Sequence, residues 1–237
     1  MGVEKEGILW LVGTPIGNLD DITLRALNVL KKSDVILAED TRRIMKLLIH
    51  FDILNKHTFS LNVNNQSRQI PGILKLLDEG KTISLVSDAG MPVISDPGNE
   101  LVEACINNAF KVDIAPGPSS VSTAIALSGF PGSHYTSFGF IPRGKNRRRL
   151  FRKLAEGLYN DSLIVFFDSP YRLKGTLKDW LDIVDDRLCF VARELTKVHQ
   201  EIYKGRVSEL ISHFEDDKIL GEITVVMSGI SEPKEDK

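Results

Sequence analysis

The stretch SDAGMPVISDPG, residues 87–98, places two carboxylates among glycines and prolines directly after an apolar segment. Asp88 stands where a strand is expected to end, and Gly90 and Pro92 shape the return of the chain. A carboxylate in such a loop accepts hydrogen bonds from ribose hydroxyls or from an amino group, and glycine lets a ligand touch the backbone. Asp96 has a structural alternative, because SDPGNELV is also typical of a turn that leads into a helix with proline near its first turn. We therefore expect Asp88, more than Asp96, to contact a ligand.

Two other loops also follow an apolar segment and precede a helical one. VGTPIGN, residues 12–18, offers glycine for close backbone approach and the free amides of a helix N-terminus, although a simple tight turn has the same pattern. It has neither the GxGxxG spacing of a dinucleotide site nor the Gly-Lys-Ser/Thr of a phosphate-binding loop. In APGPSS, residues 115–120, Ser119 and Ser120 either cap the following helix or bind a ligand through hydroxyls and amides.

A basic run at residues 141–153, IPRGKNRRRLFRK, stands out in a chain whose formal charge is only −2. Seven cations precede the first acidic residue, Glu156, and they are Arg143, Lys145, Arg147, Arg148, Arg149, Arg152 and Lys153. Charge runs usually only solvate a helix face. Segregated positive charge in a nearly neutral protein also attracts phosphates, so this run favours binding of RNA or another polyanion.

The histidines and cysteines indicate neither a metal site nor a disulfide. No metal-ligand spacing and no Ser-His-Asp signature connects the histidines, which are His50, His57, His134, His199 and His213. Cys105 and Cys189 lie in apolar periodic segments, which predicts buried thiols and fits a reducing, cytoplasmic compartment. No apolar run approaches the roughly 18 residues of a membrane span, so neither secretion nor a membrane anchor is expected.

The loops need a framework, and the apolar pattern predicts alternating strands and helices. Strands are expected at residues 8–12, 34–40, 81–88, 111–115, 135–140, 162–168, 187–193 and 222–229. Helices are expected at residues 20–33, 41–51, 67–80, 99–110 and 121–129, with further helices between the later strands. This alternation predicts an α/β protein with largely parallel or mixed sheets, whose ligands lie beyond the carboxyl ends of strands. The PGPSS interruption suggests two domains, residues 1–116 and 117–237.

Six motifs in order, TPIGNLDDITLRAL, AEDTR, SDAGMPVISDPG, PGPSS, FDSPYR and ARELTK, resemble the small-subunit ribosomal RNA methyltransferase I family. This family belongs to the tetrapyrrole methylase superfamily, and the resemblance extends from about Leu9 to Gly229. It implies two α/β domains of the tetrapyrrole methylase type that bind S-adenosylmethionine in the cleft between them. It also implies a homodimer that methylates the ribose 2′-hydroxyl of a cytidine in the decoding region of the 16S ribosomal RNA of the small ribosomal subunit.

The same resemblance implies a set of cofactor-binding residues. These are Thr14, Pro15, Ile16, Asp88, Gly90, Met91, Pro92, Ser119 and Ser120, joined by Ser169 and Leu195 of the second domain. The chain departs from the family in reading SLNVNNQSRQI where a His-rich stretch is usual, and FDSPYR where Tyr-Glu-Ser-Pro-His-Arg is usual. It also ends soon after VVMSG, where many relatives carry a further segment. These departures affect the expected contacts with substrate RNA more than the expected cofactor-binding residues.

Methyl transfer to a hydroxyl is an in-line displacement, so the enzyme must align oxygen and methyl carbon and exclude water. A protonated 2′-hydroxyl is a poor nucleophile, which calls for a general base or a cation that stabilises the alkoxide. The polar residues at predicted strand ends that suit these roles are Glu39, Asp40, Arg42, Glu194 and Lys197. An ion-pair network between the domains is an equally open interpretation of them.

Two other functions remain open at the level of the sequence. One is methylation of a small corrin precursor, as in other branches of the superfamily, although the basic run and the AEDTR and ARELTK motifs argue against it. The other is a non-catalytic RNA-binding protein of ribosome assembly that kept the fold and lost the chemistry.

Overall fold

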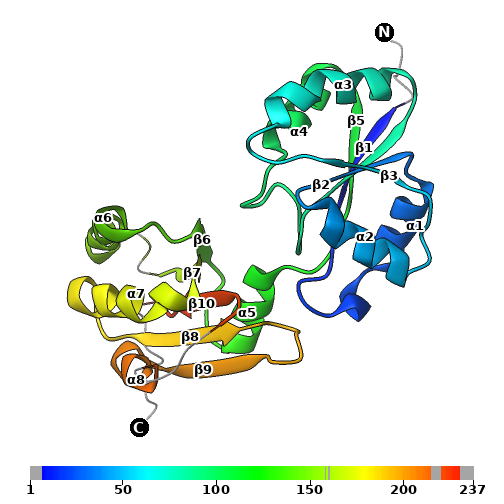
Figure 1. Cartoon of the computed structure of the whole chain (residues 1–237). Coiled ribbons are helices and arrows are strands. Elements are labelled where there is room, and N and C mark those ends of the chain that lie inside the picture. The colour runs from blue at the N-terminus through cyan, green and yellow to red at the C-terminus, as the bar shows by residue number, and fades with distance from the viewer. Residues whose placement is uncertain (1–6, 158, 160, 215–219, 230–237) are drawn as a thin grey trace. The chain divides into compact units, whose positions relative to one another are not determined.

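The computed structural model describes residues 7–157, 159, 161–214 and 220–229, and it consists of two compact units. The first unit is Met1–Ser119 and the second is Ser120–Lys237 (Figure 1). The division lies within the PGPSS loop, three residues after the boundary that the sequence suggests.

The first unit contains a five-stranded sheet in which every neighbouring pair is parallel, in the order β3-β2-β4-β1-β5. Its strands are β1 (Ile8–Val12), β2 (Val35–Ala38), β3 (His57–Ser60), β4 (Thr82–Val86) and β5 (Lys111–Ala115). Val12 at the end of β1 lies in register with Val86 of β4 and Ala115 of β5. The loops after these three strands therefore begin at the same level of the sheet.

Helices cover both faces of this sheet (Figure 1). The helices are η1 (Leu19–Asp21), α1 (Leu24–Lys32), α2 (Thr41–His50), α3 (Gln66–Asp78) and α4 (Asn99–Asn107). Leu30 of α1 and Leu48 of α2 belong to one buried cluster, whereas Leu77 of α3 and Leu101 of α4 belong to another. The chain leaves β1 toward β2 and leaves β4 toward β5, in opposite directions along the sheet. The ends of β1 and β4 thus form a topological switch point, where α/β sheets bind ligands.

The second unit is built on a mixed sheet in the order β6-β7-β10-β8-β9. Its strands are β6 (Tyr135–Phe140), β7 (Leu163–Asp168), β8 (Leu188–Arg193), β9 (Glu201–Arg206) and β10 (Ile223–Met227). Only the β6–β7 pair is parallel among these neighbours. The predicted parallel or mixed α/β architecture is therefore confirmed in both units.

In the described part of the second unit, helices pack on both faces of the sheet (Figure 1). They are α6 (Gly144–Ala155), α7 (Pro170–Ile183) and α8 (Val207–His213) on one face, and α5 (Ser120–Ser128) on the other. Phe151 of α6, Phe166 of β7 and Trp180 of α7 are fully buried and anchor the larger face. This core fixes α6 and α7 side by side.

The predicted core strands are confirmed, but the sequence missed the edge strands β3 and β9. In both, side-chain exposure alternates along the strand, and polar residues occupy most positions. Such edge strands lack the continuous apolar run that marks a central parallel strand.

The expected buried thiols are confirmed, since Cys105 and Cys189 are free and buried. Burial raises the pKa of Cys105 to about 11, so this thiol stays protonated and unreactive at neutral pH. None of the helices in the described part of the chain has the length and apolar character that crossing a bilayer requires.

Candidate functional site

The loops after β1 and β4 are joined by a pair of main-chain hydrogen bonds at the switch point. The amide of Thr14 donates to the carbonyl of Gly90 over 2.9 Å, and the amide of Gly90 donates to the carbonyl of Thr14 over 3.1 Å. The buried hydroxyl of Thr14 also donates to the carbonyl of Ser87. Ile16 packs beside Gly90, whose φ of +80° suits glycine. The two predicted loops are therefore bonded directly to each other.

The third loop, after β5, closes onto the other two. The amide of Gly117 donates to the sulfur of Met91 over 3.2 Å. A Cβ added to Gly13 would lie 2.6 Å from the Cα of Gly117, so only glycine allows this approach. Ser119 directly precedes α5, and Ser120 is its first residue. The sequence predicted three separate loops, and the structure shows that residues 13–16, 87–92 and 116–118 are in contact.

Asp88 connects the loop after β4 with the start of α2. One of its carboxylate oxygens accepts a hydrogen bond from the amide of Asp40 over 3.0 Å, and the other lies 3.4 Å from Nε of Arg43. Asp40 is the N-cap of α2, where it accepts hydrogen bonds from the amide and the guanidinium of Arg42. These hydrogen bonds lower the pKa of Asp40 to about 2. Asp40 is thus a helix cap, and Arg42 is its exposed counter-ion.

Asp96 has a bracing role, and the helix that follows begins at Asn99, as the sequence predicts. The carboxylate of Asp96 accepts a hydrogen bond from the hydroxyl of Ser87 over 2.6 Å. This hydrogen bond stabilises the loop that carries Asp88. Pro97 lies just before the first turn of helix α4, near the position that the sequence suggests. Gly98 is the N-cap. Its φ of 126° turns the chain into the helix, and its position against Leu85 leaves no room for a Cβ.

Carboxylates give this edge of the first sheet a negative electrostatic character. Partial burial, followed by the charges of Asp88 and Asp96, raises the pKa of Glu39 at the end of β2. Burial also raises the pKa of Asp96, against the hydrogen bond from Ser87 and with a contribution from Asp88. A cation placed here relieves this repulsion. In the described part of the chain, no group of three or more His, Cys, Asp or Glu side chains is arranged to hold a metal ion.

In the second unit, Glu194 and Lys197 of the ARELTK motif form an ion pair after β8. Nζ of Lys197 donates to Glu194 over 2.8 Å and to Glu222 over 3.1 Å. Partial burial opposes the charged forms, but these contacts lower the pKa of Glu194 and raise that of Lys197. Both side chains are charged at neutral pH, and Glu194 itself has a φ of +51°. This ion pair lies within the second unit, and the ion-pair network between the domains stays a prediction.

The FDSPYR motif is built around a carboxylate that the sequence did not single out. Asp168 is buried at the end of β7, where it accepts hydrogen bonds from the amide of Ser169 over 2.8 Å and from the hydroxyl of Thr176. It also pairs with Arg172 over 2.8 Å. Ser169 is the N-cap of α7, whereas Leu195 is a buried side chain after β8. The cofactor roles of Ser169 and Leu195 stay predictions.

The basic run forms α6, but two of its arginines are neutralised by α7. Arg147, with a side chain 12% exposed, donates from Nε to Asp179 over 2.8 Å and from Nη1 to Thr176 over 2.8 Å. Arg148 pairs with the same Asp179. The run itself contains no acidic residue, but Asp179, which lies beyond Glu156 in sequence, is beside α6 in space. Arg143, Lys145 and Arg149 are exposed.

The RNA-binding assignments of Arg143, Lys145, Arg147, Arg148 and Arg149 stay predictions. For Arg147 the structure adds a second role, since its guanidinium joins α6 to α7. Only helical spacing distinguishes Arg147 from Arg149 in the sequence, because Arg147 falls on the same helix face as the buried Phe151 and Leu154.

Comparison with known proteins places the chain in a family. Residues 8–211 match the family model for Tetrapyrrole (Corrin/Porphyrin) Methylases. A protein of Thermotoga maritima named Ribosomal RNA small subunit methyltransferase I is 58% identical over 223 residues, covering 94% of this chain and 99% of that one. A protein of the same name from Halalkalibacterium halodurans is 42% identical over 232 residues, covering 98% of this chain and 79% of that one.

Two solved structures share the fold at low sequence identity. A uroporphyrin-III-C-methyltransferase from Thermus thermophilus has a TM-score of 0.65 at 20% identity, covering 94% of each chain. A cobalt precorrin-4 methyltransferase has a TM-score of 0.68 at 18% identity, covering 98% of this chain and 99% of that one. The chain therefore has the tetrapyrrole methylase fold and belongs to the tetrapyrrole methylase family, within its branch of ribosomal RNA small subunit methyltransferase I proteins.

Proposed function

We propose that this chain transfers a methyl group from S-adenosylmethionine to the ribose 2′-hydroxyl of a cytidine in the 16S ribosomal RNA of the small ribosomal subunit. The observation that carries the proposal is the closure of the three strand-end loops at the switch point of the first sheet. The near full-length identity to the Thermotoga maritima relative supports the choice of ribosomal RNA as substrate.

The residues at the switch point fit S-adenosylmethionine. The close approach of Gly13 and Gly117 and the positive φ of Gly90 bring the three loops together without side chains between them. Ile16 and Met91 supply apolar surface, and the neighbouring carboxylates favour a positively charged sulfonium. The residues proposed to hold the cofactor are Thr14, Pro15, Ile16, Asp88, Gly90, Met91, Pro92, Ser119, Ser120, Ser169 and Leu195. When bound, the cofactor supplies an electrophilic methyl group.

Among the candidate catalytic residues, Glu39 is the best suited to accept the proton of the 2′-hydroxyl. Its pKa is raised by partial burial and by nearby carboxylates, which makes it a better base than an ordinary glutamate. The pKa of Glu194 is lowered, so this carboxylate is a poorer base. Lys197 stays protonated and is suited only to stabilising a developing oxyanion. Arg42 is 87% exposed and paired with Asp40, which leaves it a role in charge balance or RNA contact.

Tritium transfer tests the proposed function against its alternatives. Labelled S-adenosylmethionine is incubated with the full chain and, separately, with small ribosomal subunits lacking the modification, naked 16S RNA and a corrin precursor. We expect label in the RNA of the subunits, and a methylated nucleotide that resists alkaline hydrolysis, because alkali cleaves RNA through a free 2′-hydroxyl. Label in the corrin precursor alone would favour the small-molecule enzyme. Binding of RNA without transfer to any substrate would favour the assembly protein.

We also propose that the protein is a cytoplasmic homodimer, since its proposed substrate is a ribosomal subunit and the family resemblance implies two copies. Light scattering coupled to gel filtration tests the oligomeric state directly. A mass near the 26.4 kDa of a single chain would contradict the dimer without affecting the proposed chemistry.

A further inference from the structure

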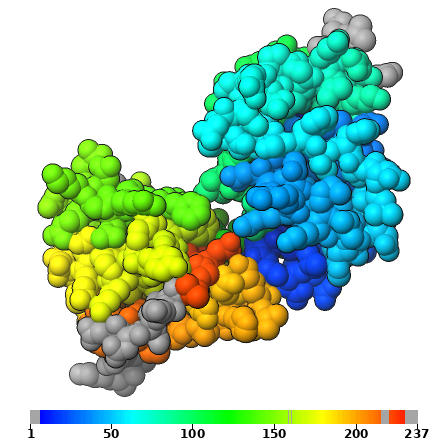
Figure 2. All heavy atoms as spheres, viewed as in Figure 1, coloured from blue at the N-terminus to red at the C-terminus, as the bar shows by residue number. Residues whose placement is uncertain are grey.

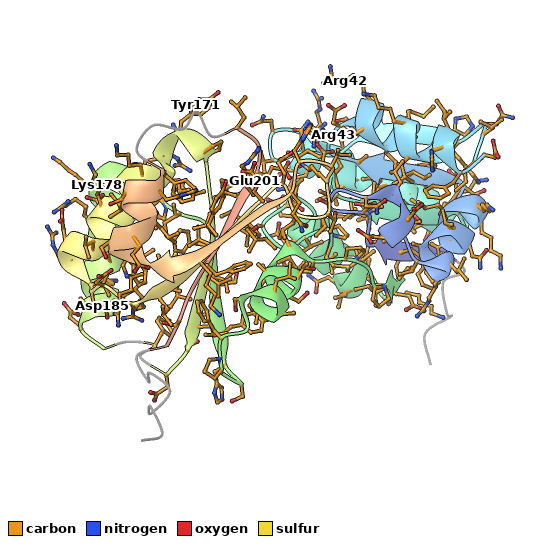
Figure 3. All side chains as sticks on the ribbon, turned by 90° about the horizontal axis from the view of Figure 1, so that it is seen from below. Arg42, Arg43, Tyr171, Lys178, Asp185 and Glu201 are labelled. Carbon is orange, nitrogen blue, oxygen red and sulfur yellow. The ribbon has the colours of Figure 1, made fainter. Side chains whose placement is uncertain are left out.

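Helix α7 presents an outward row of exposed residues that begins next to the FDSP turn. The row consists of Tyr171, Gly175 and Lys178, which recur at helical spacing and are all exposed. Figure 3 labels Tyr171 and Lys178. Tyr171 is 83% exposed, and in the described part of the chain its ring packs against no other aromatic ring. A large aromatic side chain that contributes so little to the fold is available for a ligand.

Helix α6 packs against α7 alongside this row and contacts it at Gly175. Nη2 of Arg147 donates to the carbonyl of Gly175 over 3.2 Å. A Cβ at Gly175 would lie 3.8 Å from the same guanidinium. Because Gly175 has no side chain, nothing projects from α7 at this point between the two helices. Figure 2 shows the surfaces of α6, in green, and α7, in yellow, next to each other on one face of the second unit. We call the exposed surface of Tyr171, Gly175 and Lys178 with the adjoining side of α6 the α6–α7 seam.

The seam carries positive charge because its main acidic residue is already neutralised. Asp179 is largely buried and is shared by Arg147 and Arg148, of which Arg148 remains 42% exposed. Lys145 and Arg149 of α6 and Lys178 of α7 are exposed cations. The exposed acids on these two helices, Asp182 of α7 and Glu156 beyond α6, lie toward the carboxyl ends of the helices, whereas Tyr171 lies at the amino end of α7.

We propose that the α6–α7 seam binds a single-stranded segment of RNA, in which Tyr171 stacks on a base and the cations Lys145, Arg149 and Lys178 contact phosphates. Stacking on an exposed aromatic ring beside a basic track is a common way in which proteins hold single-stranded RNA. Tyr171 follows Ser169, a proposed cofactor residue, by two positions, so a stacked base lies close to that end of β7. This inference rests on the proposed function and names the surface that positions its substrate.

The stacking is tested by steady-state kinetics of methyl transfer to small ribosomal subunits with Tyr171→Ala, Tyr171→Phe and a control, Tyr135→Ala. Tyr135 of β6 is also an exposed tyrosine of the second unit, at 55%, but lies outside the seam. We expect Tyr171→Ala to raise KM for subunits about 10-fold, the loss typical of one base stack, while KM for S-adenosylmethionine and the melting temperature stay constant. Tyr171→Phe and Tyr135→Ala should behave as the wild type.

A binding measurement keeps this inference separate from the proposed chemistry. The full chain is titrated into a fluorescent single-stranded oligoribonucleotide, with anisotropy as the readout, so that no methyl transfer is required. One outcome is that the wild type transfers no methyl group but binds the oligonucleotide, and that Tyr171→Ala abolishes this binding. That outcome would support RNA binding by the seam and contradict the proposed function. Wild-type binding by Tyr171→Ala would overturn the stacking. Binding of poly-glutamate in preference to the oligonucleotide would overturn RNA as the partner.

The electrostatic part of the seam has its own matched pair, Lys178→Ala and Lys46→Ala. Both lysines are exposed on helices, but Lys46 belongs to α2 of the first unit. Each phosphate contact on a single strand adds about 0.7 to the slope of log affinity against log salt concentration. We expect Lys178→Ala to reduce that slope by about 0.7 and Lys46→Ala to leave it unchanged. An unchanged slope for Lys178→Ala would remove this lysine from the seam.

Discussion

At the scale of the residue, Asp88 has both a structural and a proposed binding role, and the two can be separated. We expect Asp88→Ala to abolish detectable binding of S-adenosylmethionine in calorimetry. The same change removes the hydrogen bond to the amide of Asp40, which lowers the free energy of unfolding by only about 1 kcal/mol. The loss of binding should therefore greatly exceed the loss of stability.

Asp34 provides the matched control for Asp88. Its carboxylate accepts a hydrogen bond from the amide of Thr82 over 2.8 Å, which resembles the contact between Asp88 and Asp40. Asp34 precedes β2 and Thr82 begins β4, so this contact lies at the amino ends of these strands, whereas Asp88 lies beyond the carboxyl end of β4. Asp34→Ala should cost similar stability and leave cofactor affinity intact. Wild-type affinity in Asp88→Ala would remove Asp88 from the site.

Glu39 is expected to control the acid side of the pH profile. Its pKa is raised by partial burial and by Asp88 and Asp96, so the rate of methyl transfer should fall as pH falls through that raised value, because a base must be deprotonated. Glu39→Gln should remove most of the activity and the acid limb together. The raised pKa also means that the folded state loses stability as pH rises through it, so Glu39→Gln should not lower the melting temperature at neutral pH.

The control for Glu39 is Glu194→Gln. The pKa of Glu194 is lowered by Lys197 and by the amide of Glu222, despite partial burial. Its contribution to stability is present at neutral pH and is lost as pH falls, so Glu194→Gln should lower the melting temperature at pH 7. If Glu39→Gln retains an unaltered pH profile, Glu39 is not the base.

At the scale of the element, α6 carries two kinds of arginine that a single pair of variants distinguishes. Arg147→Ala leaves the largely buried Asp179 without its main partner, and we expect the free energy of unfolding to fall by about 3 kcal/mol. Arg149→Ala should change it by less than about 0.5 kcal/mol, because the side chain is exposed. Chemical denaturation measures both values.

The effects of the two variants on RNA binding should be ranked the other way, with Arg149→Ala having the larger effect. Arg149→Ala is expected to lower the salt dependence of binding to the oligoribonucleotide, whereas Arg147→Ala acts mainly through stability. The pKa of Asp179 is lowered by hydrogen bonds from Arg147 and Arg148, although burial opposes the shift. The stability cost of Arg147→Ala should therefore shrink at acid pH, where Asp179 becomes protonated. Equal stability losses for both variants would contradict this division of roles.

The helices and strands differ in how well their sequences predict them. A strand such as β2 is an apolar run that is buried along its whole length, so the pattern alone identifies it. The edge strands β3 and β9 depend on pairing with β2 and β8, which no local pattern reveals. The same reason explains Asp179, since its partner Arg147 lies 32 residues away in sequence. Local chemistry is readable from the chain, whereas long-range pairing is not.

At the scale of the whole molecule, the position of the ligand loops beyond the strand ends was predictable, whereas the switch point and the contacts that complete it were not. Alternating strands and helices place the loops after β1, β4 and β5 at one edge of the first sheet. The approach of Gly13 to Gly117 and the bond from Gly117 to Met91 depend on the strand order, which the sequence does not state. In the second unit, the burial of Asp168 was not predicted, because a single aspartate in FDSPYR has no local pattern that marks it as buried.

Hydrogen exchange measured by mass spectrometry tests the cofactor assignments in both units at once. With saturating S-adenosylmethionine, we expect slower exchange at residues 12–18, 87–92 and 115–120 of the first unit, because bound ligand suppresses local opening there. If Ser169 and Leu195 also contact the cofactor, exchange slows at residues 168–172 and 193–197 as well. Asp88→Ala should abolish all of these changes, whereas Asp34→Ala should preserve them. Protection confined to the first unit would contradict the roles of Ser169 and Leu195 while leaving the switch-point site intact.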